Sequence, residues 1–265
     1  MPAPGPVVTP TWADGDAYEP FVGRWSRRVA PRFAAWLGEA DDWCDVGCGT
    51  GALAHAVLAG PARRVLGVDP SAAFLAVARR GADDRFTGVV GHAAAIPAGD
   101  ARFDRVVAAL VLTFVPDPAA ALAEMRRVAR PGGVVAAYVW DYAEGMVLLR
   151  RFWDAAVALD PAAAPLDEGR RPGGLARPGP LADLFTGAGL HDVAVEPIVV
   201  DTVFRDADDL WLPFLGGQGP APGYVVGLPA PHRAALRDRL LADLPVAADG
   251  SIPLTARVWA VRGRR

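Results

Sequence analysis

One short stretch near residue 50 combines a carboxylate with glycines in a spacing suited to binding a nucleotide-like ligand. The run 44–51 reads Cys-Asp-Val-Gly-Cys-Gly-Thr-Gly, which predicts the end of a buried strand, a glycine turn and the start of a helix. A second apolar run, 65–69, ends in Asp69, which can accept hydrogen bonds from both hydroxyls of a ribose. Glycines let the backbone approach a ligand because they carry no Cβ. These residues predict a nucleotide-type ligand across the carboxyl edge of a parallel sheet.

The glycine spacing by itself admits two kinds of cofactor. Gly47, Gly49 and Ala52 satisfy the G-x-G-x-x-A form of a dinucleotide-binding turn. Gly51, however, gives the tighter D-x-G-x-G-x-G spacing, and the carboxylate of Asp45 would repel a pyrophosphate. That carboxylate suits a ligand with an ammonium group. S-adenosylmethionine has an amino group, a sulfonium and a ribose but no phosphate, so the residues favour it over NAD, and a dehydrogenase is kept as the alternative.

Five segments, in order, resemble motifs of the class I S-adenosylmethionine-dependent methyltransferases, and the resemblance covers residues 41–140. They are the glycine motif at 44–53, the ribose motif at 67–71, an adenine-contacting segment at 91–97, a fourth strand at 103–107, and a helix with its following turn at 115–133. The resemblance implies an α/β fold with a Rossmann-like doubly wound sheet of strand order 3-2-1-4-5-7-6, strand 7 being antiparallel. It also implies a helical N-terminal lid and C-terminal cap elements.

The same resemblance suggests how the chain is organised. It implies a tail and lid helix at 1–40, a cofactor-binding core at 41–140, and the remainder of the sheet with acceptor-site cap insertions at 141–265, as one domain overall. Strands alternating with helices indicate a parallel sheet covered on both faces. Strands are expected at 42–46, 64–68, 86–90, 103–109, 134–140, 191–200 and 252–261. Helices are expected at 18–37, 51–58, 72–80, 118–129, 144–159, 181–187 and 231–244.

Local signals refine these expectations. Pro31 is expected to interrupt or restart the first helical region, because proline removes a helix hydrogen bond. Ser71 is expected to cap the helix that follows it. Residues 160–180, rich in Pro, Gly and Arg, are expected to form a long loop, and residues 201–228 a mixed segment.

The family resemblance also implies which residues contact the cofactor. Asp45 would act on the methionine amino group, and Asp69 would bind the ribose rather than being a solvated carboxylate at a strand end. Arg24 would pair with the methionine carboxylate, since a guanidinium binds a carboxylate in a two-point fork, unless its helix only offers a solvated face. The expected cofactor-binding residues are Tyr18, Arg24, Asp45, Gly47, Cys48, Gly49, Gly51, Asp69, Pro70, His92, Ala93, Ala109 and Leu110.

One position in this region departs from the family pattern. Many family members carry an aspartate where this chain has His92. Either neutral His92 accepts a hydrogen bond from the adenine or stacks on it, or the backbone at Ala93 makes the contact.

The two cysteines, Cys44 and Cys48, flank the glycine turn, and with no suitably spaced histidines they predict no metal site.

Candidates for the methyl acceptor site come from strand ends and from the C-terminal part of the chain. Asp141 and Tyr142 are expected to orient or deprotonate the acceptor, although Asp141 is equally suited to cap the next helix. The segment 110–115 is apolar, which weakens any claim of a general base there. Trp153 is expected to be ordinary core, whereas other aromatics suit an apolar acceptor pocket. The expected substrate-binding residues are Phe114, Trp140, Trp211, Phe214 and Tyr224. His55, His191 and His232 are expected to pack or to lie on the surface.

Composition narrows the partners. The chain has 265 residues, 52% of them hydrophobic. Its net charge of -3 gives no reason to expect a nucleic-acid partner, which normally calls for a basic face. No apolar run reaches a membrane span, so a cytoplasmic protein is expected. The sequence thus predicts methyl transfer from S-adenosylmethionine to a small organic acceptor by in-line displacement. Alternatives are an S-adenosylmethionine-binding protein that catalyses a non-methylation reaction and, less favoured, an NAD-dependent dehydrogenase. The oligomeric state is not indicated.

Overall fold

The computed structural model describes residues 19–170, 174–217 and 219–265. The chain divides into two compact units. We call the larger one, formed by Gly23–Asp141, Pro172–Val200 and Arg257–Arg265, the sheet unit. The other, formed by Met1–Val22, Tyr142–Arg171 and Asp201–Ala256, is called the helical unit. The single domain expected from the sequence stays a prediction.

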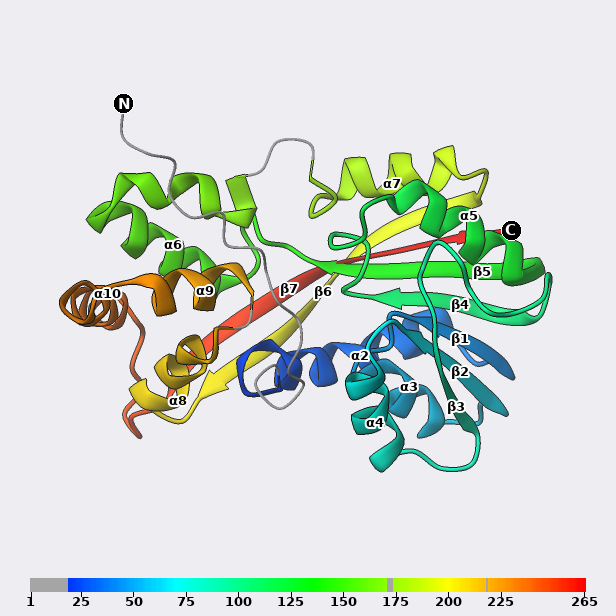
Figure 1. The fold of residues 1–265 in the computed structure, drawn as a ribbon, viewed down its shortest axis with the longest axis horizontal. Coiled ribbons are helices and arrows are strands. Elements are labelled where there is room, and N and C mark those ends of the chain that lie inside the picture. Colours follow the sequence, from blue (N-terminus) through cyan, green and yellow to red (C-terminus); the bar gives the residue numbers. More distant parts are fainter. Residues whose placement is uncertain (1–18, 171–173, 218) are drawn as a thin grey trace. The chain divides into compact units, whose positions relative to one another are not determined.

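A seven-stranded sheet carries the predicted strand order, β3-β2-β1-β4-β5-β7-β6 (Figure 1). β1 to β5 pair in parallel, and β7 pairs antiparallel with β5. The predicted topology is therefore confirmed, including the reversed seventh strand. The strands are β1 Asp42–Val46, β2 Arg64–Asp69, β3 Phe86–Val90, β4 Phe103–Ala109, β5 Ala129–Trp140, β6 His191–Phe204 and β7 Ile252–Arg264.

Helices of the sheet unit cover both faces of the sheet. Figure 1 shows α2 (Arg24–Leu37), α3 (Ala52–Leu58) and α4 (Ala72–Arg80) on one face, and α5 (Pro118–Val128) and α7 (Pro178–Gly187) on the other. From Val134 to Trp140, β5 is buried on both faces, because both faces of the sheet are covered there. Its Tyr138 ring meets Phe33 of α2 with ring centroids 4.8 Å apart, while Val139 belongs to the opposite core, which includes Leu122 and Phe185. This alternation follows from the two-residue period of a strand.

Several element boundaries differ from those predicted. Pro31 does not interrupt α2, which runs unbroken from Arg24 to Leu37 after a short π-helical turn, η1 (Glu19–Gly23). Burial of Val29, Ala30 and Phe33 anchors the helix on both sides of the proline. β5, β6 and β7 are longer than predicted, because sheet pairing extends strands past the end of their apolar pattern. The helix expected from residue 144 begins at Val147.

In the helical unit, short helices occupy much of the chain for which a long loop (160–180) and a mixed segment (201–228) were predicted. Its aromatic core centres on Phe152 and Phe214, whose rings stack at 4.7 Å with planes 9° apart. Asp167 is fully buried and forms ion pairs with Arg150 and Arg170, which ties the segment after α6 (Val147–Leu159) back onto that helix. The helices of this unit are α6 Val147–Leu159, η2 Pro161–Leu166, η3 Glu168–Arg170, α8 Ala207–Trp211, η4 Leu212–Gly216, α9 Pro220–Gly227 and α10 Ala230–Ala242.

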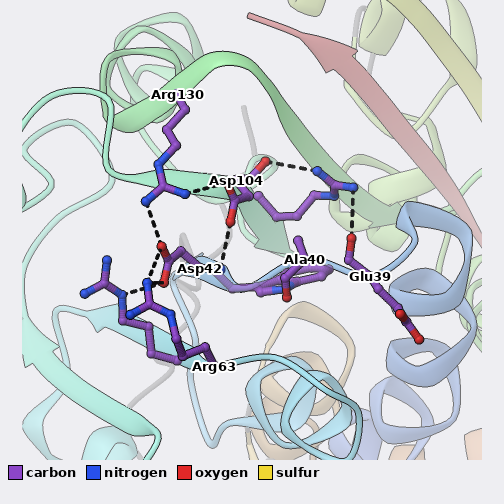
Figure 2. Close-up of polar contacts among 9 residues, drawn as sticks. Glu39, Ala40, Asp42, Arg63, Asp104 and Arg130 are labelled. Carbon is purple, nitrogen blue, oxygen red and sulfur yellow. Dashed lines mark hydrogen bonds and ion pairs between the residues drawn. The ribbon is translucent and has the colours of Figure 1, made fainter.

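A cluster of arginines and aspartates ties together the amino-terminal ends of the parallel strands (Figure 2). Asp42, which is 1% exposed, accepts hydrogen bonds from Arg63 and Arg130, and Arg64 lies 2.7 Å from it. Arg130 also donates to Asp104 at 2.6 Å, and Asp104 in turn accepts from the backbone N–H of Asp42. Burial would raise the pKa of Asp42, but the three guanidinium groups outweigh burial and lower that pKa. The glycine turn follows the carboxyl end of β1. This cluster therefore stabilises the opposite, amino-terminal ends of the strands.

Candidate functional site

The glycine turn after β1 has a backbone conformation that only glycine adopts readily. Gly47, Gly49 and Gly51 all adopt positive φ angles, of 69°, 54° and 85°, which residues with a Cβ rarely adopt. The N–H of Gly47 donates to the carbonyl of Val68 at 2.6 Å, which joins the turn to β2. A Cβ added at Gly47 would lie 2.3 Å from a methyl group of Val111. The turn therefore requires glycine for backbone shape and, at Gly47, for space.

Asp69, at the end of β2, is held rigidly by backbone amides. One of its carboxylate oxygens accepts from the N–H of Gly49 at 2.9 Å, and the other accepts from the N–H of Ser71 at 2.8 Å. Asp69 is only 6% exposed, so it is not a solvated carboxylate. Burial raises its pKa, against the effect of the two amides. Each oxygen keeps a further lone pair with which to accept a ligand hydroxyl. Ser71 caps α4 as predicted, because its hydroxyl accepts from the N–H of Phe74.

Asp45, within β1, lies in a different environment. It is 1% exposed, and neither of its carboxylate oxygens has a hydrogen bond of ordinary geometry within the described part of the chain. Burial and then the charge of Asp69 raise the pKa of Asp45 to about 7, while the backbone amide of Ala54 lowers it slightly. Buried polar groups are almost always hydrogen-bonded. A buried carboxylate without such partners is suited to receive a cationic group from a ligand.

Other predicted cofactor residues surround the same edge of the sheet. Leu110, directly after β4, has a φ of 62°, a strained value for a residue with a side chain, and its N–H donates to the carbonyl of Tyr138. Strain of this kind is concentrated at functional sites. Ala109 and Ala93 are half-buried, whereas Pro70 is exposed.

The structure leaves some of the predicted cofactor contacts as predictions. His92 is exposed in the loop after β3, so the choice between its ring and the backbone of Ala93 stays open. Arg24 begins α2, and its guanidinium lies 4.4 Å from the ring centroid of Trp25. Its pairing with a ligand carboxylate stays a prediction, and Tyr18 lies outside the described residues.

The two cysteines are buried and are not disulfide-bonded to each other. Burial raises the pKa of both thiols well above the ordinary value, so they are neutral. A Cβ at Gly67 would lie 2.8 Å from the sulfur of Cys48, so Gly67 keeps space for the turn. This role of Gly67 could not be predicted from the sequence. The same holds for the contact of Val111 with the glycine turn and for the effect of the Ala54 amide on Asp45, because each depends on which elements become neighbours.

The predicted acceptor residues at the end of β5 are mostly buried. Asp141 is 2% exposed and accepts from Arg257, with nitrogen–oxygen distances of 2.7 and 2.5 Å. It does not cap the next helix, because α6 has Met146 at its N-cap and no side-chain cap. Trp140 is 2% exposed, and its indole N–H finds no partner among the described residues. The catalytic roles of Asp141 and Tyr142 stay predictions.

The aromatics predicted to bind substrate differ in exposure. Phe214 and Trp211 are buried at 0% and 5% exposure, with ring centroids 5.7 Å apart, so they belong to the core of the helical unit. Tyr224 is half-buried with its hydroxyl 3.4 Å from Asp160, and Phe114 is 42% exposed. Trp153 is fully buried, which confirms its core role. A pocket made by these residues stays a prediction.

The predicted histidine roles agree with the structure. His55 lies 2.8 Å from the carbonyl oxygen of Ala78 and packs beside Phe86. His191 and His232 are exposed. No group of three or more His, Cys, Asp or Glu side chains in the described ranges is arranged to hold a metal ion.

Taken together, the strand order and the two carboxylates beside a glycine turn define the class I methyltransferase fold. Comparisons with known proteins agree. A family model for the methyltransferase domain matches residues 44–137. A ubiquinone/menaquinone biosynthesis C-methyltransferase of Methylobacterium nodulans is 43% identical over 95 residues, which cover 34% of this chain and 38% of that protein.

Solved structures share the fold over most of the chain. A phosphoethanolamine N-methyltransferase 2 of Haemonchus contortus, in complex with phosphomonomethylethanolamine and S-adenosylhomocysteine, has a TM-score of 0.54 at 18% identity, covering 95% of this chain and 57% of that one. The 4+2 cyclase SpnF has a TM-score of 0.52 at 22% identity, and the match covers 89% of this chain and 80% of the cyclase.

Residues 44–137 of the chain thus match the methyltransferase-domain family, and the fold agrees with that match. The segments matched in its first curated relatives span less than half of their length. Among the described residues, no helix is both long and apolar enough to cross a membrane.

Proposed function

We propose that this protein binds S-adenosylmethionine and transfers its methyl group to a small organic acceptor. The observation that carries this proposal is the carboxylate of Asp45, in the strand that leads into the glycine turn, which is buried and has no hydrogen bond of ordinary geometry among the described residues. A cation satisfies that carboxylate and a phosphate does not. The rigidly held Asp69, with lone pairs free for ribose hydroxyls, supports a nucleoside attached to that cation.

The residues of this chain supply binding and alignment. Asp45 would hold the ammonium group, Asp69 the ribose, and the backbone at Gly47, Gly49 and Gly51 would lie against the ligand without side chains between. S-adenosylmethionine supplies a methyl group on a positively charged sulfur, which is displaced in line by an acceptor lone pair. Such a reaction gains most from orientation and from exclusion of water. Asp141 and Tyr142 are proposed to orient the acceptor or to take its proton.

A small acceptor is supported by charge and by the relatives. The net charge of -3 does not favour a polyanionic substrate. The names of similar proteins mention ubiquinone, menaquinone and phosphoethanolamine, all of them small molecules. We extend to this chain only the shared feature, a small organic acceptor.

A second candidate function is a non-methylating reaction that uses the same cofactor site. The similarity to the 4+2 cyclase SpnF favours it, as does the apolar segment 110–115, which lacks a base. Formation of S-adenosylhomocysteine with any acceptor in a screen would exclude this candidate as the sole activity. A dehydrogenase is disfavoured, because Asp45 would face the pyrophosphate of NAD.

The proposal is tested by calorimetric titration of the full chain with S-adenosylmethionine, S-adenosylhomocysteine and NAD in parallel. Binding of the two adenosyl ligands alone is expected, and binding of NAD alone would refute the proposal. Asp69→Ala is expected to weaken S-adenosylhomocysteine binding by about 1–3 kcal/mol, as for loss of a buried charged hydrogen-bond partner. Asp83→Ala is the matched control, because Asp83 is a surface carboxylate paired with Arg85. Equal affinities for the two variants would count against the site.

A further inference from the structure

The two carboxylates at the ligand-binding edge are held in opposite ways. Both oxygens of Asp69 accept backbone N–H groups at 2.8–2.9 Å, which stabilises its charged form. Asp45 is 1% exposed, and its oxygens have no hydrogen-bond donor of ordinary geometry among the residues described. Two neighbouring carboxylates do not readily ionise together in a buried site, because like charges repel. Of the two, only Asp69 has hydrogen bonds of ordinary geometry among the described residues, and these stabilise its charge. The proton that the pair retains therefore belongs mainly on Asp45.

We propose that binding of the cofactor expels this proton, so that the site takes up its cationic ligand in exchange for a proton held by Asp45. The inference rests on the proposed function, since it needs a ligand with an ammonium group. A neutral Asp45 offers no charge to an ammonium, whereas the ionised form does. The cation then takes over the role of the proton in neutralising the buried carboxylate.

Among the described residues, no other titratable group near Asp45 explains such an exchange equally well. From β2 it faces Asp69, whose charged form the two amides favour. Its neighbours in β1 and in the turn include Cys44 and Cys48, whose thiols stay protonated because burial raises their pKa. α3 contributes the backbone amide of Ala54, and the β4 residue in register with Asp45 is the apolar Val107.

The size of the pH dependence of ligand affinity follows from the pKa of Asp45. With a pKa of about 7, Asp45 is ionised in about one tenth of molecules at pH 6 and about nine tenths at pH 8. Apparent affinity scales with the fraction of molecules that can bind. S-adenosylhomocysteine is therefore expected to bind about tenfold more tightly at pH 8 than at pH 6. About 0.9 proton per ligand is expected to be released at pH 6, and about 0.1 at pH 8.

The experiment is calorimetric titration of the full chain with S-adenosylhomocysteine at pH 6, 7 and 8. Each pH is measured in two buffers of different ionisation enthalpy, which counts the protons released by the unaltered protein. The control ligand is 5′-methylthioadenosine, which keeps the nucleoside and the thioether but has no ammonium group. Its affinity is expected to change less than about twofold over the same range. Asp45→Asn, close in shape but unable to ionise, is expected to bind S-adenosylhomocysteine with an affinity independent of pH.

Each outcome decides one question. A tenfold pH dependence with proton release, absent for methylthioadenosine, supports the exchange. Tight binding with a flat pH profile and no proton release overturns it and leaves the proposed function intact. A pH dependence retained in Asp45→Asn assigns the titration to another group and also overturns the exchange. No binding of S-adenosylhomocysteine at any pH refutes the proposed function itself. Should Asp45→Asn fail to fold, the proton count and the methylthioadenosine control still decide.

Discussion

Replacing Asp45 with asparagine is expected to stabilise the ligand-free protein while weakening its ligand site. The reason is that the native state at neutral pH must keep a carboxylate charge buried without hydrogen-bond partners of ordinary geometry among the described residues. An asparagine of nearly the same shape carries no charge, so the variant folds without the free-energy cost of burying a charged carboxylate. Stability and binding would then change in opposite directions, which is typical of a residue kept for function.

The magnitude follows from the pKa of Asp45, which rises from an ordinary 3.8 to about 7 on folding. Each unit of difference corresponds to about 1.36 kcal/mol, so the ionised carboxylate costs the native state about 4 kcal/mol above pH 7. Because the pKa is raised in the folded state, the stability that it confers is fully present below 3.8 and is lost as pH rises through about 7. The advantage of Asp45→Asn is therefore expected to grow by about 3 kcal/mol between about pH 4.5 and about pH 7.5.

Urea denaturation of the ligand-free protein and the variant across that pH range measures this difference. Comparison at each pH cancels the contribution of other titrating groups, such as Asp42, that the two proteins share. The decisive quantity is the change in the stability difference with pH, and not its value at one pH. A difference that is constant from acid to neutral pH would refute the assignment of a buried proton to Asp45.

Two further predictions concern stability. Gly47→Ala is expected to destabilise the protein by about 2–4 kcal/mol in urea denaturation, because its Cβ would lie 2.3 Å from Val111 at a positive φ. Gly132→Ala has a similar φ of 73° but nothing within 4 Å, so a loss near 1 kcal/mol is expected, and equal losses would contradict the steric argument. Asp42→Asn is expected to cost about 1–3 kcal/mol at pH 7, less than for a fully buried pair because its arginines are 39–60% exposed. Since the pKa of Asp42 is lowered by folding, this loss should shrink as pH falls below about 4, and a pH-independent loss would argue against the ionic origin.

Much of the fold could be predicted because local signals were strong. β1, β3 and β4 have the predicted bounds, since short apolar runs between turn residues define strands in a parallel sheet. Ser71 caps its helix because capping depends only on residues three apart. Pro31 misled the prediction, because the cost of proline in a helix was overcome by burial of its neighbours, which the local sequence does not reveal.

The sequence by itself determined the glycine turn and the two carboxylates beside it, because these depend on residue type and on short spacings, while the order of the strands was implied by the family resemblance. Only the tertiary structure decided how those groups behave. It holds Asp69 with amides from two separate turns and leaves Asp45 without such donors among the described residues. It also pairs Asp141 with Arg257, 116 positions away, and places Phe214 in an aromatic core. Burial and charge depend on contacts between distant parts of the chain, and no local pattern encodes those contacts.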